Sequence, residues 1–147
     1  MRTRRSRRYF ATLAAAGALV LGGALPAHAA VALAGPGAAV AGYATRIVAT
    51  PDGTPVTFVN ADVSDHTVTA ADATLRRKAA KKTSYCKAYG VRSCPLFTSG
   101  VVPGGESAEV RGLGRAKPGR EYEFVCQIHG SMQGTLIVLG TAAPLDR

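Results

Sequence analysis

Three side chains that can bind soft or borderline metal ions follow one another near the end of the chain. They are Cys126, His129 and Met132, in the segment YEFVCQIHGSMQGTLIV. A thiolate and a thioether bind soft ions such as Cu(I), and an imidazole binds copper or zinc. The spacing therefore predicts three ligands of one metal site, and the alternative is a hairpin that carries sulfur and imidazole for no shared purpose.

The first 29 residues have the three regions of a bacterial export signal. Five arginines without any acid precede an apolar run at 11–25, and the triplet AHA at 27–29 supplies the small residues of a cleavage point. The run is too short for a bilayer, which needs about 20 residues. The motif SRRYF at 6–10 resembles a twin-arginine signal, and a general secretory signal is the alternative. We therefore predict a periplasmic or extracellular protein, cleaved near Ala29, without a membrane anchor.

Cleavage would leave 118 of the 147 residues, enough for one domain with one core. The formal net charge falls from +9 to +4, because the five arginines of residues 1–29 are lost. The remainder lacks the interleaved aromatic and basic residues of nucleic-acid-binding proteins, which excludes that class. We expect a monomeric domain over 43–140, with a flexible lead-in at 30–42 and a short tail at 141–147.

Export also affects the interpretation of the three cysteines. Cysteines of exported proteins usually pair, so an odd one needs an explanation. Cys86 and Cys94 lie in a loop-like stretch with Gly90 and Pro95, and they are the expected disulfide. A bridge there would stabilise the domain by about 2–3 kcal/mol. Cys126 is then left without a cysteine partner, which favours a metal ion as its partner.

Four candidate ligands remain once residues 1–29 are set aside. They include every remaining histidine, the only remaining methionine and the odd cysteine. Two imidazoles, a thiolate and a weak thioether are the donors of a mononuclear blue-copper site, which binds one ion as Cu2+ and as Cu+. The four residues are His66, Cys126, His129 and Met132.

Other kinds of site fit these residues less well. Methionine is a poor zinc ligand, and structural zinc sites normally use two or more cysteines. A set of four unrelated residues is a further alternative. An enzyme is not expected, because no histidine remains for a second copper centre and no nucleophile–base pair can form without taking a ligand.

The elements that must position these ligands are predicted to be strands. Short runs rich in β-branched and aromatic residues are separated by turns containing Gly and Pro, which is typical of an all-β antiparallel sandwich or barrel. Alternation places Cys126 on the inward face with Tyr122 and Phe124, and His66 on the same face as Val68. The predicted strands span 44–50, 55–60, 66–70, 107–111, 121–126 and 135–139.

Residues 71–100 interrupt the strand pattern. Residues 71–82 predict a short basic helix capped by Asp72, and the loop between Cys86 and Cys94 follows. One interpretation is a solvated insert stapled by the disulfide. The other is a docking surface for an acidic partner, which the basic stretch from Arg76 to Lys82 would attract electrostatically.

The two ligand regions together resemble the cupredoxins, the small blue copper proteins similar to plastocyanin and amicyanin. The segment YEFVCQIHGSMQGTLIV looks like their C-terminal ligand loop. The segment VTFVNAD at 56–62, with HTV at 66–68, is similar to their first ligand region. The two-residue gap between His129 and Met132 resembles the short amicyanin-type loop. The resemblance extends over most of 44–140, and residues 71–100 match poorly.

The resemblance implies a Greek-key β-sandwich and a one-electron carrier between redox partner proteins. A copper sequestration or delivery protein with the same ligands is the alternative. Many cupredoxins have Asn at the position of Thr67, whose hydroxyl is expected to make a related hydrogen bond between the ligand loops. Asn60 is expected to support the site as well. The ligands carried over by motif are His66, Cys126, His129 and Met132.

Overall fold

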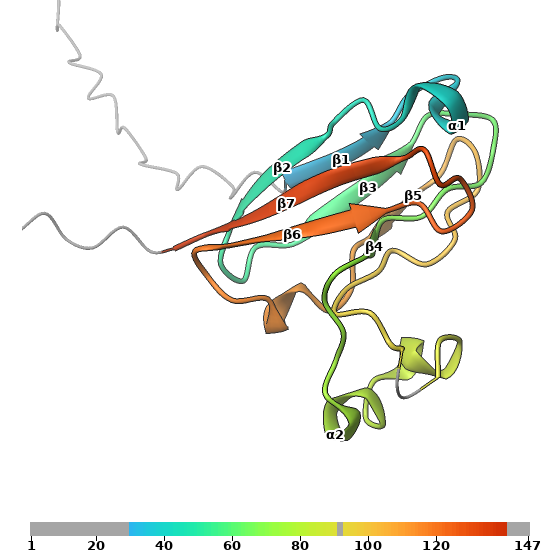
Figure 1. The fold of residues 1–147 in the computed structure, drawn as a ribbon. Helices are drawn as coiled ribbons and strands as arrows, with labels where there is room; N and C mark the ends of the chain where they lie inside the picture. Colours follow the sequence, from blue (N-terminus) through green and yellow to red (C-terminus); the bar gives the residue numbers. More distant parts are fainter. Residues whose placement is uncertain (1–29, 91–92, 141–147) are drawn as a thin grey trace, which may run out of the picture.

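A computed structural model describes residues 30–90 and 93–140 of the chain (Figure 1). The predicted export signal and the C-terminal tail lie outside these residues. The described part is a sandwich of two β-sheets, as the sequence predicts. Within it, no helix has the length and apolar character needed to cross a membrane.

One sheet has three strands and the other has four. The order of the first is β1 (Ala30–Ala34), β3 (Val56–Asn60) and β5 (Ser107–Glu109). The order of the second is β2 (Ile47–Pro51), β7 (Gln133–Leu139), β6 (Arg120–Val125) and β4 (Thr69–Ala70).

Two of the five strand pairings are parallel, where the sequence predicts an antiparallel sandwich. They are the pairings of β1 with β3 and of β2 with β7, and the other three are antiparallel. The reason is that β1 and β2 are consecutive in the chain but belong to different sheets. Each therefore pairs with a strand distant in sequence, and no hairpin turn sets its direction.

The segment 30–42 is not a flexible lead-in, because it forms β1 and the short helix α1 (Ala38–Ala41). Ala32, Ala34 and Ala38 are almost completely buried, with exposed fractions of 1%, 0% and 1%. Small side chains let this segment pack closely against the rest of the core. Its composition therefore reflects tight packing and not disorder.

Alternation along the strands fills the space between the sheets. Tyr122, Phe124 and Cys126 are buried, which confirms the predicted inward face of this strand. Tyr43 packs edge-on against Phe58 and Phe124, with ring centroids 6.2 and 5.0 Å apart. The run 66–70 differs, because all five residues are buried and only its last two form β4. Residues 97–102 pair with this run and cover it.

The predicted helix over 71–82 is reduced to α2 (Arg77–Ala80), and a 3-10 helix, η1 (Ser84–Lys87), follows it. The residues before α2 pair with other segments instead, since Leu75 N donates to Cys94 O and Leu96 N donates to Ala73 O. Cys86 and Cys94 form the predicted disulfide.

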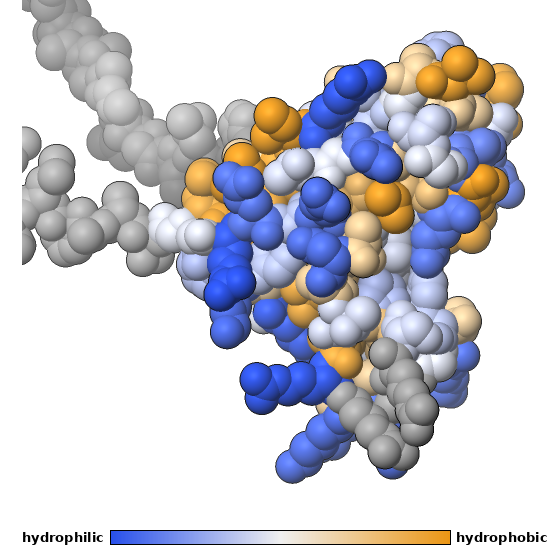
Figure 2. Space-filling view, in the orientation of Figure 1, coloured by the Kyte–Doolittle hydropathy of each residue, from blue (hydrophilic) through white to orange (hydrophobic). Residues whose placement is uncertain are grey.

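These contacts make a narrow neck from which residues 76–90, here called the lobe, project (Figure 1). Hydrophilic side chains project from this side of the molecule (Figure 2). A second 3-10 helix, η2 (Leu113–Arg115), precedes β6.

Candidate metal centre

His66 lies in the connection between β3 and β4 and is fully buried. Its backbone forms an isolated bridge with Val102: His66 N donates to Val102 O at 3.1 Å, and Val102 N donates to His66 O at 2.8 Å. The imidazole is therefore carried by a backbone that two hydrogen bonds hold to Val102.

Cys126, His129 and Met132 lie in the loop between β6 and β7. Cys126 N donates to Met132 O and Met132 N donates to His129 O, both at 3.1 Å, so the loop closes on itself. Cys126 and Met132 are buried, whereas His129 is half-buried. The loop thus presents the thiol inward and leaves part of one imidazole near solvent.

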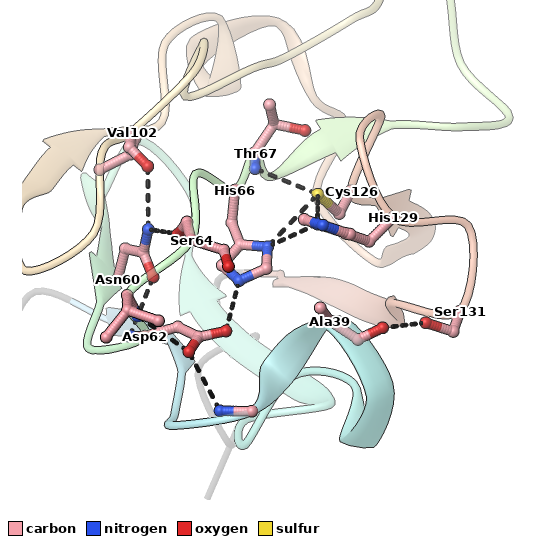
Figure 3. Close-up of polar contacts among 12 residues, drawn as sticks. Ala39, Asn60, Asp62, Ser64, His66, Thr67, Val102, Cys126, His129 and Ser131 are labelled. Atoms are coloured by element: carbon pink, nitrogen blue, oxygen red, sulfur yellow. Dashed lines mark hydrogen bonds and ion pairs between the residues drawn. The ribbon is translucent and has the colours of Figure 1, made fainter.

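Three of the four predicted ligands meet at this end of the sandwich (Figure 3). Cys126 Sγ lies 3.7 Å from His66 Nδ1 and 3.8 Å from His129 Nδ1, and the two Nδ1 atoms are 3.1 Å apart. Ligand atoms placed about 2.0–2.3 Å from one ion in a trigonal plane would lie about 3.6 Å apart. The donor atoms therefore have the spacing that a shared ion requires. Met132 belongs to the same loop, and its role as an axial ligand stays a prediction.

Thr67 joins the two ligand loops, as expected for this position. Its backbone N–H donates to Cys126 Sγ at 3.4 Å, and its Oγ1 accepts from Gln127 N at 2.9 Å. The Tyr43 hydroxyl donates to Thr67 O from the core side. Thr67 is itself buried, so these contacts are shielded from water.

Asn60 organises the loop that carries His66. Its Nδ2 donates to Ser64 O at 2.8 Å and to Val102 O at 2.9 Å, and its Oδ1 accepts from Asp62 N at 3.1 Å. Val102 is also the backbone partner of His66. Asn60 therefore supports His66 through a shared neighbour, and none of these hydrogen bonds involves the imidazole.

Asp62 is a residue of this site that sequence reasoning missed. Its Oδ2 lies 2.9 Å from His66 Nε2 (Figure 3). Its Oδ1 accepts from Val63 N at 2.8 Å and from Gly37 N at 3.1 Å. The four-residue spacing from Asp62 to His66 was the available signal, since ligating histidines usually donate their second N–H to an acceptor such as a carboxylate.

Comparison with known proteins identifies the fold. No protein-family model and no curated protein matches the sequence. A purple cupredoxin from Nitrosopumilus maritimus superposes with a TM-score of 0.51 and 20% identity, over 74% of this chain and 98% of that chain. A reduced form of an amicyanin mutant gives a TM-score of 0.50 and 16% identity, over 79% and 86%. The chain has the cupredoxin fold.

The electrostatics of this cupredoxin-fold site favour the thiolate form of Cys126. Burial acts to raise the pKa of Cys126, but hydrogen bonds from Thr67 N–H and from His66 outweigh it and lower the pKa to about 7. The thiolate, which is the form that binds metal, is thus accessible near neutral pH.

The Asp62–His66 contact shifts both partners. The hydrogen bond with His66, together with the N–H groups of Gly37 and Val63, holds the pKa of Asp62 well below its usual range. Burial lowers the pKa of His66, but hydrogen bonds with Asp62 and Cys126 outweigh it, so the pKa is raised. Asp62 is therefore a carboxylate that orients His66 with Nε2 toward it and Nδ1 toward Cys126.

The donor set of the cupredoxin-fold site fits copper better than the alternatives. Two imidazole nitrogens and one thiolate sulfur suit both oxidation states of copper, and a structural zinc site would normally have more cysteine. Three of the four candidate residues also place their donor atoms within 4.8 Å of one another. This clustering argues against the alternative that the four residues are unrelated.

Proposed function

We propose that this chain is an exported protein with one mononuclear type 1 (blue) copper ion, and that it carries single electrons between redox partners. The observation that supports this most is the meeting of three donor atoms within 4.8 Å, from two loops distant in sequence. Bound copper supplies one-electron chemistry, and His66, Cys126 and His129 would hold it. Met132 would supply a further, weaker donor through its thioether.

The surrounding residues hold the donors in place before any ion binds. Thr67 positions the Cys126 sulfur, Asp62 orients the His66 ring, and Asn60 organises the loop between them. A set of ligands held in this way would rearrange little when a bound ion is oxidised or reduced. Little rearrangement favours rapid electron transfer.

Burial supports a carrier over the delivery alternative. His66 and Cys126 have exposed fractions of 0% and 2%, so an acceptor protein would have difficulty reaching them to extract copper. His129 is the one of the three donors that is only half-buried. We propose that electrons enter and leave along the His129 side, where redox partner proteins would dock.

Three further predictions belong to this proposal. Secretion to the periplasm or the exterior rests on the sequence of residues 1–29. An acidic partner on the basic stretch from Arg76 to Lys82 stays a prediction, as does the monomeric state. Charge reversal at Arg76 and Lys78 would lower a partner's association rate if this stretch steers an acidic protein.

The decisive experiment adds Cu(II) to the metal-free protein and records visible and electron-paramagnetic spectra. We expect an intense thiolate-to-copper band that appears with one equivalent of copper and is lost in Cys126→Ser. Ser131→Ala is the matched control, because it alters an exposed hydroxyl of the same loop, which donates to Ala39 O at 2.7 Å. This control should keep the band. A protein that develops no band with stoichiometric copper would refute the site.

A further inference from the structure

The cations of the described chain gather on one part of its surface. Residues 73–105 contain seven Lys and Arg residues and neither Asp nor Glu. Of all Lys and Arg residues in the described ranges, only Arg46 lies outside the span from Arg76 to Arg120. The lobe therefore has a strong positive charge that the opposite parts of the molecule lack.

The fold joins cations that are distant in sequence. Arg76 of the lobe lines a hollow of about 330 Å³ together with Arg115 of η2 and Lys117. A second hollow of about 330 Å³ is lined by Lys81, Lys82 and Lys87. We call these six residues the cationic face; they are Arg76, Lys81, Lys82, Lys87, Arg115 and Lys117.

A close contact holds the two parts of the cationic face together. Gly112 precedes η2 with φ of +99°, and a Cβ there would collide with Leu96 O and the Tyr85 hydroxyl. Tyr85 of the lobe donates to Leu96 O at 2.8 Å, and the Arg111 guanidinium lies 5.7 Å from the centre of its ring. The connection before β6 is thus packed against the lobe, which makes the cations of the two segments neighbours in the fold.

These cations have no carboxylate partners among the residues whose side chains are described. The one ion pair there joins Asp62 to His66 at the metal centre. All six side chains of the cationic face are exposed. Their charge is therefore available to an external anion and is not used to stabilise the fold.

The lobe has no exposed apolar anchor. The large apolar side chains that stand exposed in the described ranges all lie outside residues 76–90. Stable protein–protein interfaces usually have an apolar core with a few buried aromatic or arginine anchors. A surface that offers charge alone is better suited to an extended anionic layer than to a specific acidic protein. The apolar residues concerned are Val31, Val40, Ile47, Val63, Val101, Ile128 and Leu139.

The cationic face is also separated from the metal centre. Strand β6 runs from Arg120, which lies three residues after Lys117, to Val125, next to Cys126. Six steps of about 3.3 Å place Arg120 and Cys126 about 20 Å apart. Arg115 and Lys117 of the cationic face precede the Arg120 end of this strand, so an anionic surface bound at these two residues would leave His129 accessible.

We propose that the cationic face binds a lipid membrane surface through its anionic headgroups and so holds the protein peripherally, with the metal centre free for redox partners. Each Lys or Arg near such a surface strengthens binding about five-fold. Six of them produce a reversible association that weakens as salt screens the charges. This inference does not depend on copper, because no ligand residue takes part in it.

The test measures co-sedimentation of the processed protein with vesicles of phosphatidylcholine alone or mixed with phosphatidylglycerol. The processed form is needed because the arginines of residues 1–29 would themselves bind anionic lipid. We expect binding to the anionic vesicles only, equal with and without copper, and weaker at high salt. Lys81→Gln with Lys82→Gln, and Arg115→Gln with Lys117→Gln, should each lower the partition coefficient about ten-fold or more.

The matched control is Arg46→Glu, which changes the net charge by the same two units outside the cationic face. This variant should bind nearly as well as the unmodified protein. If Arg46→Glu lowers the partition coefficient as much as the double variants do, the proposal is overturned, because net charge alone would then explain the binding. Saturable binding to a poly-glutamate peptide with no binding to anionic vesicles would also overturn it, and would restore the acidic-protein interpretation.

Discussion

At the scale of single residues, the second nitrogen of the His66 imidazole matters as much as the first. Asp62 holds His66 Nε2 at 2.9 Å and is itself held by the N–H groups of Gly37 and Val63. A carboxylate at this position stabilises positive charge on the metal side of the ring. It therefore favours the oxidised ion over the reduced one.

We predict that Asp62→Asn raises the reduction potential by tens of millivolts, because the negative charge next to His66 is lost while the shape is kept. The measurement is redox titration of the copper-loaded protein. Asp65→Asn is the control, since it removes the same charge from an exposed residue of the same loop. Equal shifts in the two variants would show that Asp62 acts only through long-range charge.

At the scale of elements, the β6–β7 hairpin carries three of the proposed ligands, and a glycine decides how its strands pack. Gly134 lies opposite Phe124 in the register of these strands. A Cβ at this position would collide with the Phe124 ring and lie 2.9 Å from Arg46 O. The ring has little room to move, because it also packs against Tyr43.

We predict that Gly134→Ala destabilises the metal-free protein by about 1–3 kcal/mol, as overpacked cores commonly do. Urea unfolding measures the effect. Gly114→Ala is the matched control, because a methyl group there would meet no atom within 4 Å and φ is not positive; it should change stability by less than about 0.5 kcal/mol. A Gly134→Ala variant as stable as this control would mean that the hairpin can shift to accommodate a methyl group.

At the scale of the whole molecule, the two proposals concern two different parts of the structure. The ligand loops lie at one end of the sandwich, whereas nearly all described cations lie on the lobe and the segment before β6. A carrier built in this way could bind a membrane through the cationic face and exchange electrons on the His129 side. The proposed carrier is an exported protein.

Export is predicted to depend on Arg7 and Arg8. Replacing both with Lys should abolish secretion if the twin-arginine route is used, since that pathway is read as a specific address. Immunodetection in the exported fraction is the measurement. Arg4→Lys with Arg5→Lys is the control, because it makes the same change a few residues upstream and should leave secretion intact. Unchanged secretion in both variants would favour the general secretory route.

The sequence by itself determined the set of candidate metal donors and much of the architecture. Removal of 1–29 and pairing of Cys86 with Cys94 left one set of four metal-binding side chains, and period-two alternation predicted that Cys126 points inward. The pairing of Cys86 with Cys94 and the inward direction of Cys126 are confirmed, because cysteine number and strand periodicity are local properties. The strands predicted from local composition lie within a few residues of those observed.

Only the tertiary structure decided the features that depend on contacts between distant segments. The alanine-rich stretch 30–42 looks featureless, yet it forms β1 and brings Gly37 to Asp62, because small side chains pack wherever a strand edge is available. The helix predicted over 71–82 shortened because its first residues pair with residues 94–96. Arg76, Arg115 and Lys117 line one hollow because the chain packs closely around Gly112. No local sequence pattern encodes this packing.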